Sequence, residues 1–490
     1  MIKRNAIIST YKKEGIEVLA KALVDHNYTI FATKGTHEYL GKFSIKSEEI
    51  ERIAKSPEMF GGRVKTLSSY LLGGVLCKER NDPDLEKNGI TPIDLVFVEP
   101  YDFKSKFLKG EQDLVEDIDI GGITLFRAAA KNYYRVAVIP GMSFVDFALK
   151  SMVDGEIPLD VRKKLAGEAF RYTSYYDYMI SQWFLQESET FVIGGTKFMD
   201  LRYGENPHQK AHSYNFYKPF FSVIKEGKEM SYNNIMDAWA AWELSLRLGK
   251  KSAVVVKHSS ACGASRESNS LESAYESDSI SAYGGVLAFN GLFGEEEADF
   301  LRDKYVEVLI ASDFSRVSLE KLAKKKGLRV LKGNEDCFSI PDIKTAGNII
   351  LSQDWNSKSD LKYEVVTGEI DEEMIRSLEF GWEVIKSVRS NAAIIVNGQW
   401  LAASTGGQPN RVDSVESSLK KAKDGNRIGN MSLLISDGFF PFSDSLEFVN
   451  QYGVRFVAAP MGSIRDDEII NYAKKTGITF IKVGERAFKH

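Results

Sequence analysis

The sequence has little cysteine, and this limits both its redox setting and its metal chemistry. The 490 residues include three cysteines, Cys77, Cys262 and Cys337, which lie far apart. Three separated thiols make no disulfide framework, and they do not supply the ligands of a cysteine-rich zinc site. We therefore expect a cytoplasmic protein that holds no zinc.

Long hydrophobic runs and an excess of one charge are also absent. No stretch approaches the roughly 18 apolar residues that a membrane span needs, and the first residues lead directly into an expected strand without a signal-peptide pattern. The 64 basic and 68 acidic residues nearly cancel, to a formal charge of -4. Neither a membrane nor a nucleic acid is therefore an expected partner, and basic residues must act locally.

What remains is an ordinary globular composition, 43% hydrophobic and 27% charged, in a chain long enough for about three domains. Strands, helices and Gly-rich turns alternate along it, which predicts an α/β fold. A stretch without clear period around Gly194-Gly195 is the best boundary, and the alternation repeats from near residue 360. We expect domains at 1–190, 200–360 and 361–490.

The N-terminal residues predict a β-α-β unit, with strands at 5–10 and 28–33 and a helix at 14–26. This arrangement implies parallel strands with a right-handed crossover. Lys12, Lys13 and the run Lys34-Gly35-Thr36 follow the two strands, and such small or cationic groups suit a phosphate. The alternative is that these lysines only solubilise the surface.

Two further strand or helix ends in this part carry polar groups. A strand at 94–99 leads into Tyr101, and Asp119 with Gly121-Gly122 precedes a helix at 124–132. Arg127 and Lys131 lie four residues apart and so on one helix face. The glycines allow a ligand to approach the helix N-terminus, which favours negative charge, although a plain Gly-rich helix start remains an alternative.

A reactive pair follows a buried strand in the middle of the chain. Ala253 to Val256 are small or β-branched apolar residues, and Lys257-His258 come next, before an expected turn at 259–263. In α/β proteins ligands bind outside the carboxyl ends of the strands. The pair suits acyl transfer, with His258 as base and Lys257 as proton donor or oxyanion partner. The alternative is a solvated strand end without a function.

These stretches, taken in order, resemble a family of bifunctional purine-biosynthesis enzymes. Residues 201–209 match its L-R-Y-G-x-N-P-H-Q and residues 231–235 its S-Y-N-N-I. Residues 256–263 are similar to V-K-H-x-x-P-C-G with Ala261 for the proline, and Tyr283 replaces the phenylalanine of S-A-F-G-G. The resemblance covers nearly the whole chain, and this many motifs in one order are specific.

The family joins 5-aminoimidazole-4-carboxamide ribotide (AICAR) formyltransferase to inosine monophosphate (IMP) cyclohydrolase. The resemblance implies formyl transfer from 10-formyltetrahydrofolate to AICAR, then ring closure of the formylated product (FAICAR) to IMP. It also implies a parallel, Rossmann-like domain of the methylglyoxal-synthase type, followed by two cytidine-deaminase-like α/β/α subdomains. A homodimer with transferase sites at its interface is implied as well. A monovalent cation held by carbonyl oxygens would leave no trace in the sequence.

The resemblance also assigns site residues. Transfer falls to Lys257, His258 and Asn391, and ring closure to Lys65, Tyr101, Asp119 and Lys131. The expected ligand-binding residues of the transferase are Arg202, Tyr203, Asn234, Tyr283, Gly284, Asp313, Gln408, Phe439 and Arg486. Those of the cyclohydrolase are Lys12, Lys34, Gly35, Thr36, Arg63, Thr66, Gly121, Gly122 and Arg127.

One segment departs from the family pattern. Where the family reads K-T-L-H-P-K-x-H-G-G, residues 65–74 read K-T-L-S-S-Y-L-L-G-G, so both histidines and the second lysine are missing. An alternative is therefore an active transferase whose N-terminal domain only binds ribotide phosphate. A zinc deaminase is excluded, because the chain has no H-x-E with P-C-x-x-C.

Overall fold

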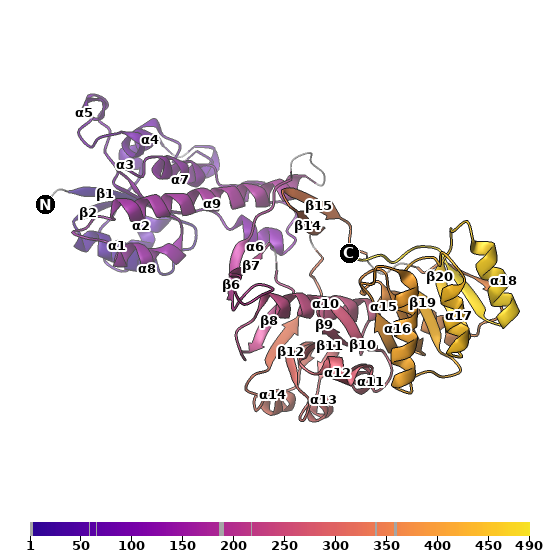
Figure 1. Ribbon diagram of the computed structural model, residues 1–490. Coiled ribbons are helices and arrows are strands. Elements are labelled where there is room, and N and C mark those ends of the chain that lie inside the picture. Colours follow the sequence, from indigo (N-terminus) through magenta and orange to yellow (C-terminus); the bar gives the residue numbers. More distant parts are fainter. Residues whose placement is uncertain are drawn as a thin grey trace. The chain divides into compact units, whose positions relative to one another are not determined.

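The computed structural model describes residues 3–57, 59–64, 66–185, 191–216, 218–338, 341–356 and 360–490. The chain divides into two units, Met1–Gly195 and Thr196–His490 (Figure 1).

The first unit is built on a five-stranded sheet with the order β3-β2-β1-β4-β5. Its strands are β1 (Arg4–Thr10), β2 (Tyr28–Ala32), β3 (Glu48–Glu49), β4 (Leu95–Glu99) and β5 (Ala137–Ile139). All neighbouring strands are parallel, which confirms the expected Rossmann-like sheet. The strand order reverses between β1 and β4, and a crevice that binds ligands forms at such a point.

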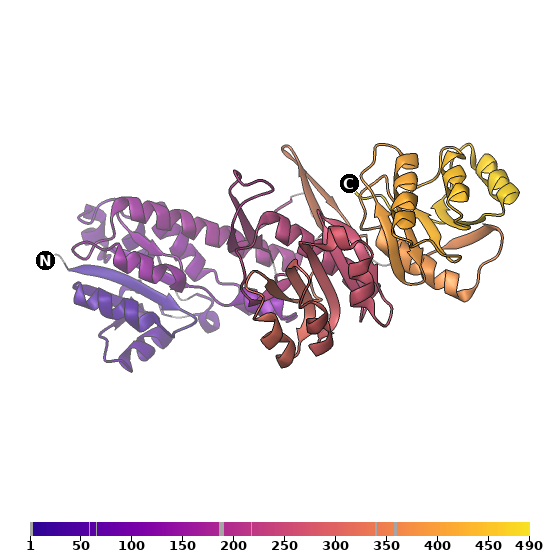
Figure 2. The same cartoon turned by 60° about the horizontal axis from the view of Figure 1, so that its bottom comes forward.

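Helices cover both faces of this sheet (Figures 1 and 2). One face carries α1 (Ile16–Asp25), α2 (Lys34–Gly41) and α8 (Val145–Lys150), and the other carries α4 (Ser69–Leu76), α7 (Gly121–Lys131) and α9 (Leu159–Phe184). Shorter helices are α3 (Glu51–Ala54), α5 (Pro83–Asn88) and α6 (Phe103–Leu108). The residues Lys34-Gly35-Thr36, which follow β2, form the first turn of α2.

The second unit holds a mixed sheet of twelve strands, in the order β16-β21-β20-β19-β17-β18-β10-β9-β11-β12-β13-β8. Its first half contains β8 (Phe221–Lys225), β9 (Ala253–Lys257), β10 (Ser260–Ser265), β11 (Gly285–Phe293), β12 (Val306–Phe314) and β13 (Arg329–Gly333). Its second half contains β16 (Tyr363–Thr367), β17 (Ala393–Asn397), β18 (Trp400–Thr405), β19 (Leu433–Ser436), β20 (Phe456–Pro460) and β21 (Thr479–Val483). Two separate hairpins are β6 (Thr196–Leu201) with β7 (Ala211–Asn215) and β14 (Asp342–Ala346) with β15 (Ile349–Gln353).

The two halves of this sheet follow one plan. Each has an antiparallel hairpin, β9–β10 or β17–β18, followed by an antiparallel neighbour and two parallel strands, β11 to β13 or β19 to β21. An antiparallel edge strand, β8 or β16, completes each half. The halves join where β10 pairs with β18 at Ser265 and Trp400, so one continuous sheet results.

Strand alternation divides the core of this unit into layers. Val254, Val256, Ile394 and Val396 point to the face covered by α10 (Tyr232–Leu248) and α15 (Glu372–Ile385), and form one cluster across both halves. Their neighbours in sequence point to the opposite face. There the first half packs on α11 (Ser270–Glu276), α12 (Ser279–Ala282), α13 (Glu295–Phe300) and α14 (Arg316–Leu322), and the second on α16 (Arg411–Asp424), α17 (Asp444–Gln451) and α18 (Asp466–Thr476).

A buried ion-pair network joins α10 to α15. The Arg247 guanidinium donates to Glu243 on its own helix at 2.7 Å and to Glu383 of α15 at 2.9 Å. The side chains of Arg247 and Glu383 are 6% and 8% exposed. Removing one partner of a buried pair leaves the other charge uncompensated, which costs more than the net value of the pair.

We predict that Glu383→Ala lowers the free energy of unfolding by about 3 kcal/mol. Urea unfolding followed by tryptophan fluorescence measures this, since five of the six tryptophans, all but Trp183, lie in the second unit. Glu320→Ala is the matched control, because the Arg316–Glu320 pair is exposed and should change the value by less than about 0.5 kcal/mol. Equal effects of the two substitutions would contradict the role of the network.

Candidate active sites

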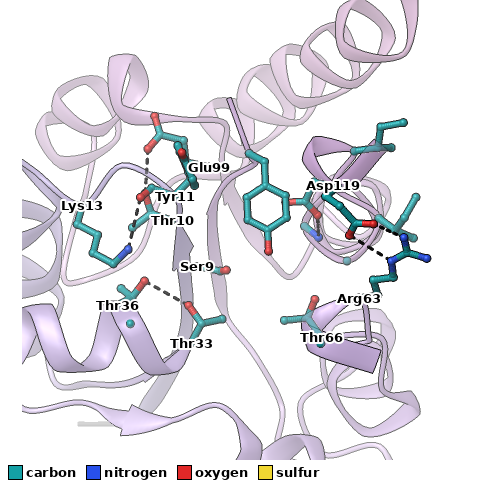
Figure 3. Close-up of a pocket in the computed structure, with 18 of the residues that line it drawn as sticks. Ser9, Thr10, Tyr11, Lys13, Thr33, Thr36, Arg63, Thr66, Glu99 and Asp119 are labelled. Atoms are coloured by element: carbon teal, nitrogen blue, oxygen red, sulfur yellow. Dashed lines mark hydrogen bonds and ion pairs between the residues drawn. The ribbon is translucent and has the colours of Figure 1, made fainter. Parts of the chain in front are cut away.

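The first unit has a cavity of about 580 Å³ at the carboxyl ends of β1, β2 and β4 (Figure 3). It lies where the strand order of the sheet reverses, as in other doubly wound folds. Its lining comprises Ser9, Thr10, Tyr11, Lys13, Thr33, Gly35, Thr36, Gly61, Arg63, Thr66, Glu99, Tyr101, Val115, Glu116, Ile118, Asp119, Ile120, Gly121 and Gly122.

One side of this cavity suits an anion. The N-terminus of α2 opens onto it with Gly35 and Thr36, and the Thr33 and Thr36 hydroxyls lie 3.2 Å apart. Helix N-termini favour negative charge because their first amide groups have no partner within the helix. Lys13 also lines the cavity, and its ammonium donates to the Tyr11 carbonyl at 3.4 Å.

Two expected phosphate ligands lie outside this lining. Lys12 forms an ion pair with Asp102 at 2.9 Å, and this hydrogen bond raises the pKa of the lysine. Lys34 is exposed at the start of α2. Of the three lysines expected near the phosphate, Lys13 lines the cavity.

The other side of the cavity holds Asp119 (Figure 3). Tyr101 lines the cavity as well, and both residues belong to the groups expected for ring closure. The Asp119 carboxylate accepts the Gly122 amide at 2.6 Å, and the Asp119 amide donates to the Tyr176 hydroxyl at 2.8 Å. Burial raises the pKa of Asp119, although hydrogen bonds from three backbone amides act in the opposite direction. A carboxylate in this setting is fixed in place and costly to ionise.

Gly121 and Gly122 permit this close packing. A Cβ atom on Gly121 would lie 2.3 Å from the Thr66 hydroxyl, and one on Gly122 would lie 2.7 Å from the Asp119 carboxylate. Arg63 and Glu116 form an ion pair at the edge of the same cavity. The structure thus brings together Arg63, Thr66 and the Gly-Gly pair, as the sequence suggested.

The remaining ring-closure groups are not found in this cavity. Lys131 and Arg127 lie farther along α7 and line a separate open groove, where the Arg127 guanidinium lies 5.4 Å from the centre of the Phe170 ring. Lys65 lies outside the described residues. The groups of this cavity that the sequence analysis missed include Ser9, Thr10 and Glu99, and the Thr10 hydroxyl donates to Glu99 at 2.8 Å. Their position at the carboxyl ends of β1 and β4 is the feature from which the sequence could have predicted them.

The second unit has a smaller cavity, of about 290 Å³, between the β9–β10 hairpin and the β18 region. Lys257, His258 and Gln408 line it, as do the unpredicted Asp278, Lys421 and Arg427. The Lys257 ammonium donates to the Tyr283 carbonyl at 2.8 Å. Three of the residues expected for the transferase thus share one cavity, and a fourth, Tyr283, accepts a hydrogen bond from one of them, Lys257.

Residues 259–263 were expected to form a turn, and this expectation was wrong beyond Ser259. Residues His258 and Ser259 alone form the turn, with φ angles of 55° and 57°, and Ser260–Ser265 return as β10. Two-residue hairpins with two left-handed residues follow the twist of the sheet. The Asn-Gly sequence that usually marks such turns is not present at 258–259, and for this reason the sequence did not predict β10.

Asn391 is held beside this cavity by a polar network. Its amide nitrogen donates to the Gln408 carbonyl at 3.1 Å, and its amide oxygen accepts Arg411 at 2.8 Å. Arg411 also forms a buried ion pair with Asp437 and donates to Ser436. The orientation of the Asn391 amide is therefore defined by its partners.

The other expected transferase residues lie elsewhere in the second unit. Asn234 closes the N-terminus of α10 in a capping box and donates to Glu307 at 2.9 Å, while Asp313 pairs with Lys332 at 3.0 Å. Arg202 and Arg486 lie over the rings of Tyr203 and Phe488. None of these lines the 290 Å³ cavity, nor do Gly284 and Phe439.

The described residues contain neither a cluster suited to a metal ion nor a helix suited to a membrane. No group of three or more His, Cys, Asp or Glu side chains in the described part of the chain is placed to hold a metal ion. Nor does that part contain a helix of the length and hydropathy that a membrane crossing requires.

Comparisons with known proteins agree with this architecture. A model described as MGS-like domain matches residues 15–124, which defines the class of the N-terminal sheet, and one described as AICARFT/IMPCHase bienzyme matches residues 129–421. Proteins called "Bifunctional purine biosynthesis protein PurH" from Aquifex aeolicus, Clostridium botulinum and Limosilactobacillus reuteri are 39%, 38% and 36% identical to this chain. The alignments cover at least 99% of this chain and 100% of each relative. The chain therefore belongs to the AICARFT/IMPCHase bienzyme family.

We predict that IMP cyclohydrolase activity depends on ionised Asp119. Because burial raises the pKa of this group, the carboxylate gains its proton at a higher pH than an ordinary aspartate does. The rate should therefore decline as the pH falls through this raised pKa, and the pH–rate profile measures it. A profile that stays flat down to about pH 4, the range of an unperturbed aspartate, would contradict the assignment.

Proposed function

We propose that the two cavities carry out the two reactions of the family separately. The chain is an AICAR formyltransferase and IMP cyclohydrolase, which performs two steps of purine biosynthesis. We assign ring closure to residues 1–190 and formyl transfer to two subdomains, 200–360 and 361–490. The observation that carries the transferase assignment is the shared lining of one cavity by Lys257, His258 and Gln408, with Asn391 bonded to the Gln408 carbonyl.

In the transferase, His258 acts as the general base. The 5-amino group of AICAR is a poor nucleophile, because its lone pair is delocalised into the imidazole ring. His258 takes a proton from this nitrogen as it bonds to the formyl carbon, and Lys257 and Asn391 donate hydrogen bonds to the resulting oxyanion. The bond between the formyl carbon and the folate nitrogen then breaks, and that nitrogen takes up a proton.

In the cyclohydrolase, the carboxamide nitrogen of FAICAR attacks the new formyl carbon and water leaves. Asp119 takes a proton from the attacking amide, and Tyr101 supplies one to the formyl oxygen. The formamide nitrogen gives up its proton as the new C=N bond forms, and the oxygen leaves with a second proton, as water. The ribotide phosphate lies at the N-terminus of α2, where Gly35, Thr36 and Lys13 surround it. Lys65 remains the expected fourth group of this site.

The dispersed residues support a homodimer in which a partner subunit completes the sites. Lys131 lies away from the first cavity, and Arg202, Tyr203 and Arg486 away from the second. The formyl donor is 10-formyltetrahydrofolate, zinc has no role, and a monovalent cation is compatible with the chemistry. The proposed partners are small molecules and a second copy, with no nucleic acid or membrane, in the cytoplasm.

The alternative of a phosphate-binding N-terminal domain without activity receives no support. Tyr101 and Asp119 share the cavity that also carries the proposed anion site, so the chemical groups lie in the same cavity as the place proposed for the ribotide phosphate. The altered residues 68–72 belong largely to α4 and the residue that caps it, and they are not in the lining of this cavity.

We predict that His258→Ala lowers the kcat of formyl transfer by about 100-fold to 10,000-fold, because it removes the general base. Cyclohydrolase activity on added FAICAR should be unchanged, and the urea midpoint followed by tryptophan fluorescence, which reports on the second unit, should match the wild type and so show that this unit has folded. Both activities are measured on one preparation, formyl transfer by the tetrahydrofolate released and ring closure by IMP. Formyl transfer at the wild-type rate in this variant would refute the role of His258.

A further inference from the structure

The turn that carries His258 is strained and is tied to a carboxylate. Both His258 and Ser259 adopt left-handed backbone conformations, which cost energy for residues with a Cβ atom. The Asp237 carboxylate accepts the Ser259 amide at 2.6 Å through one oxygen and the His258 amide at 3.3 Å through the other. One side chain therefore binds both backbone donors of the turn.

The second half of the sheet has a two-residue turn at the corresponding place, where the first residue but not the second has a positive φ. There β17 ends at Asn397 and β18 begins at Trp400, so the two-residue turn is Gly398-Gln399. Gly398 has a φ of 57°, close to that of His258, and glycine adopts this conformation without strain. The first half places a histidine where the equivalent turn has a glycine.

The helices that cover the two hairpins, α10 and α15, differ at the residue that matches Asp237. Asp237 lies six residues after Ser231, the N-cap of α10. The matching residue of α15, six after its N-cap Asp371, is Ser377, whose hydroxyl donates to the Glu373 carbonyl of its own helix. The carboxylate is thus present in the half whose turn is strained and is replaced in the half whose turn contains glycine.

The surroundings of the Asp237 side chain strengthen its hydrogen bonds to the turn. The side chain is partly buried beneath the hairpin, and burial raises the pKa of its carboxyl while the two turn amides lower it. A carboxylate that is desolvated and bound to two amides forms strong, charge-assisted hydrogen bonds. These hydrogen bonds therefore fix the position of the β9–β10 turn relative to α10.

We propose that Asp237 is a positioning residue of the transferase, which holds the strained His258-Ser259 turn so that the imidazole faces the cavity. The inference rests on the proposed role of His258 as general base. Proton transfer needs the base within hydrogen-bond reach of the amine, so a shift of about 1 Å in the turn lowers kcat. Asp237 contacts the backbone of the turn, so substrate affinity does not depend on it.

The test is Asp237→Ala in the full-length protein, assayed for both activities. The kcat of formyl transfer should fall by about 10-fold to 100-fold, the loss expected for charged hydrogen bonds that fix a catalytic group. The KM values for AICAR and 10-formyltetrahydrofolate should change by less than about twofold, as should cyclohydrolase activity. Loss of affinity without loss of kcat would overturn the proposal.

The double variant Asp237→Ala/Ser259→Gly distinguishes positioning from general stability. Glycine adopts the left-handed conformation freely, so the turn regains its shape without the carboxylate, and kcat should recover about fivefold over the single variant. A lower kcat in Asp237→Ala without any recovery in the double variant would contradict control through the turn.

Asp371→Ala is the matched control, because its carboxylate also accepts a backbone amide, that of Met374 at 2.8 Å, but in α15. It should destabilise the second unit and leave the kcat of formyl transfer within about twofold. An equal loss of kcat in this control would reduce Asp237 to a stabilising residue and overturn the proposal. His258→Ala is assayed alongside, so that failure of the general-base assignment is seen separately from failure of the Asp237 inference.

Discussion

Burial of the central strands on both faces is the constraint on which the sites depend. β1, β2 and β4 in the first unit, and β9, β17 and their neighbours in the second, are almost entirely apolar and covered by helices. Polar side chains therefore emerge where these strands end, since an unpaired polar group inside the sheet would be costly. Tyr101 follows β4 and His258 follows β9, while Asn391 lies just before β17. The chemistry of the chain is concentrated at strand ends for this reason.

Both proposed sites then use carboxylates in partly buried surroundings, but for different purposes. Asp119 is bound by backbone amides at the start of α7 and also lines a cavity, so it is placed to exchange a proton. Asp237 uses both oxygens on backbone amides of a turn and is not in the lining of the second cavity. Burial raises the pKa of both carboxyl groups, so the pKa shift does not distinguish their roles. The roles differ because of what each carboxylate contacts.

The sequence predicted the class of fold, because buried strands and Gly-rich helix starts have strong local signals. The β-α-β unit and its parallel strands could be predicted in this way, whereas the grouping of Tyr101 with Asp119 in one site followed from the resemblance to the family. The structure corrected details that depend on conformation: a two-residue turn without glycine concealed β10, and Lys13 rather than Lys34 lines the anion site. Asp237 lies 21 residues before His258 on a helix, and no local pattern connects a helix residue to the turn it binds.

The central claim is that one chain performs formyl transfer and ring closure at two separate sites. The most direct test mixes two variants, His258→Ala and Asp119→Ala, with AICAR and 10-formyltetrahydrofolate, and follows IMP by chromatography. The account predicts that neither variant alone converts AICAR to IMP, and that Asp119→Ala alone accumulates FAICAR. In the mixture, FAICAR released by one variant should be closed to IMP by the other. FAICAR that accumulates in the mixture without forming IMP would contradict the account.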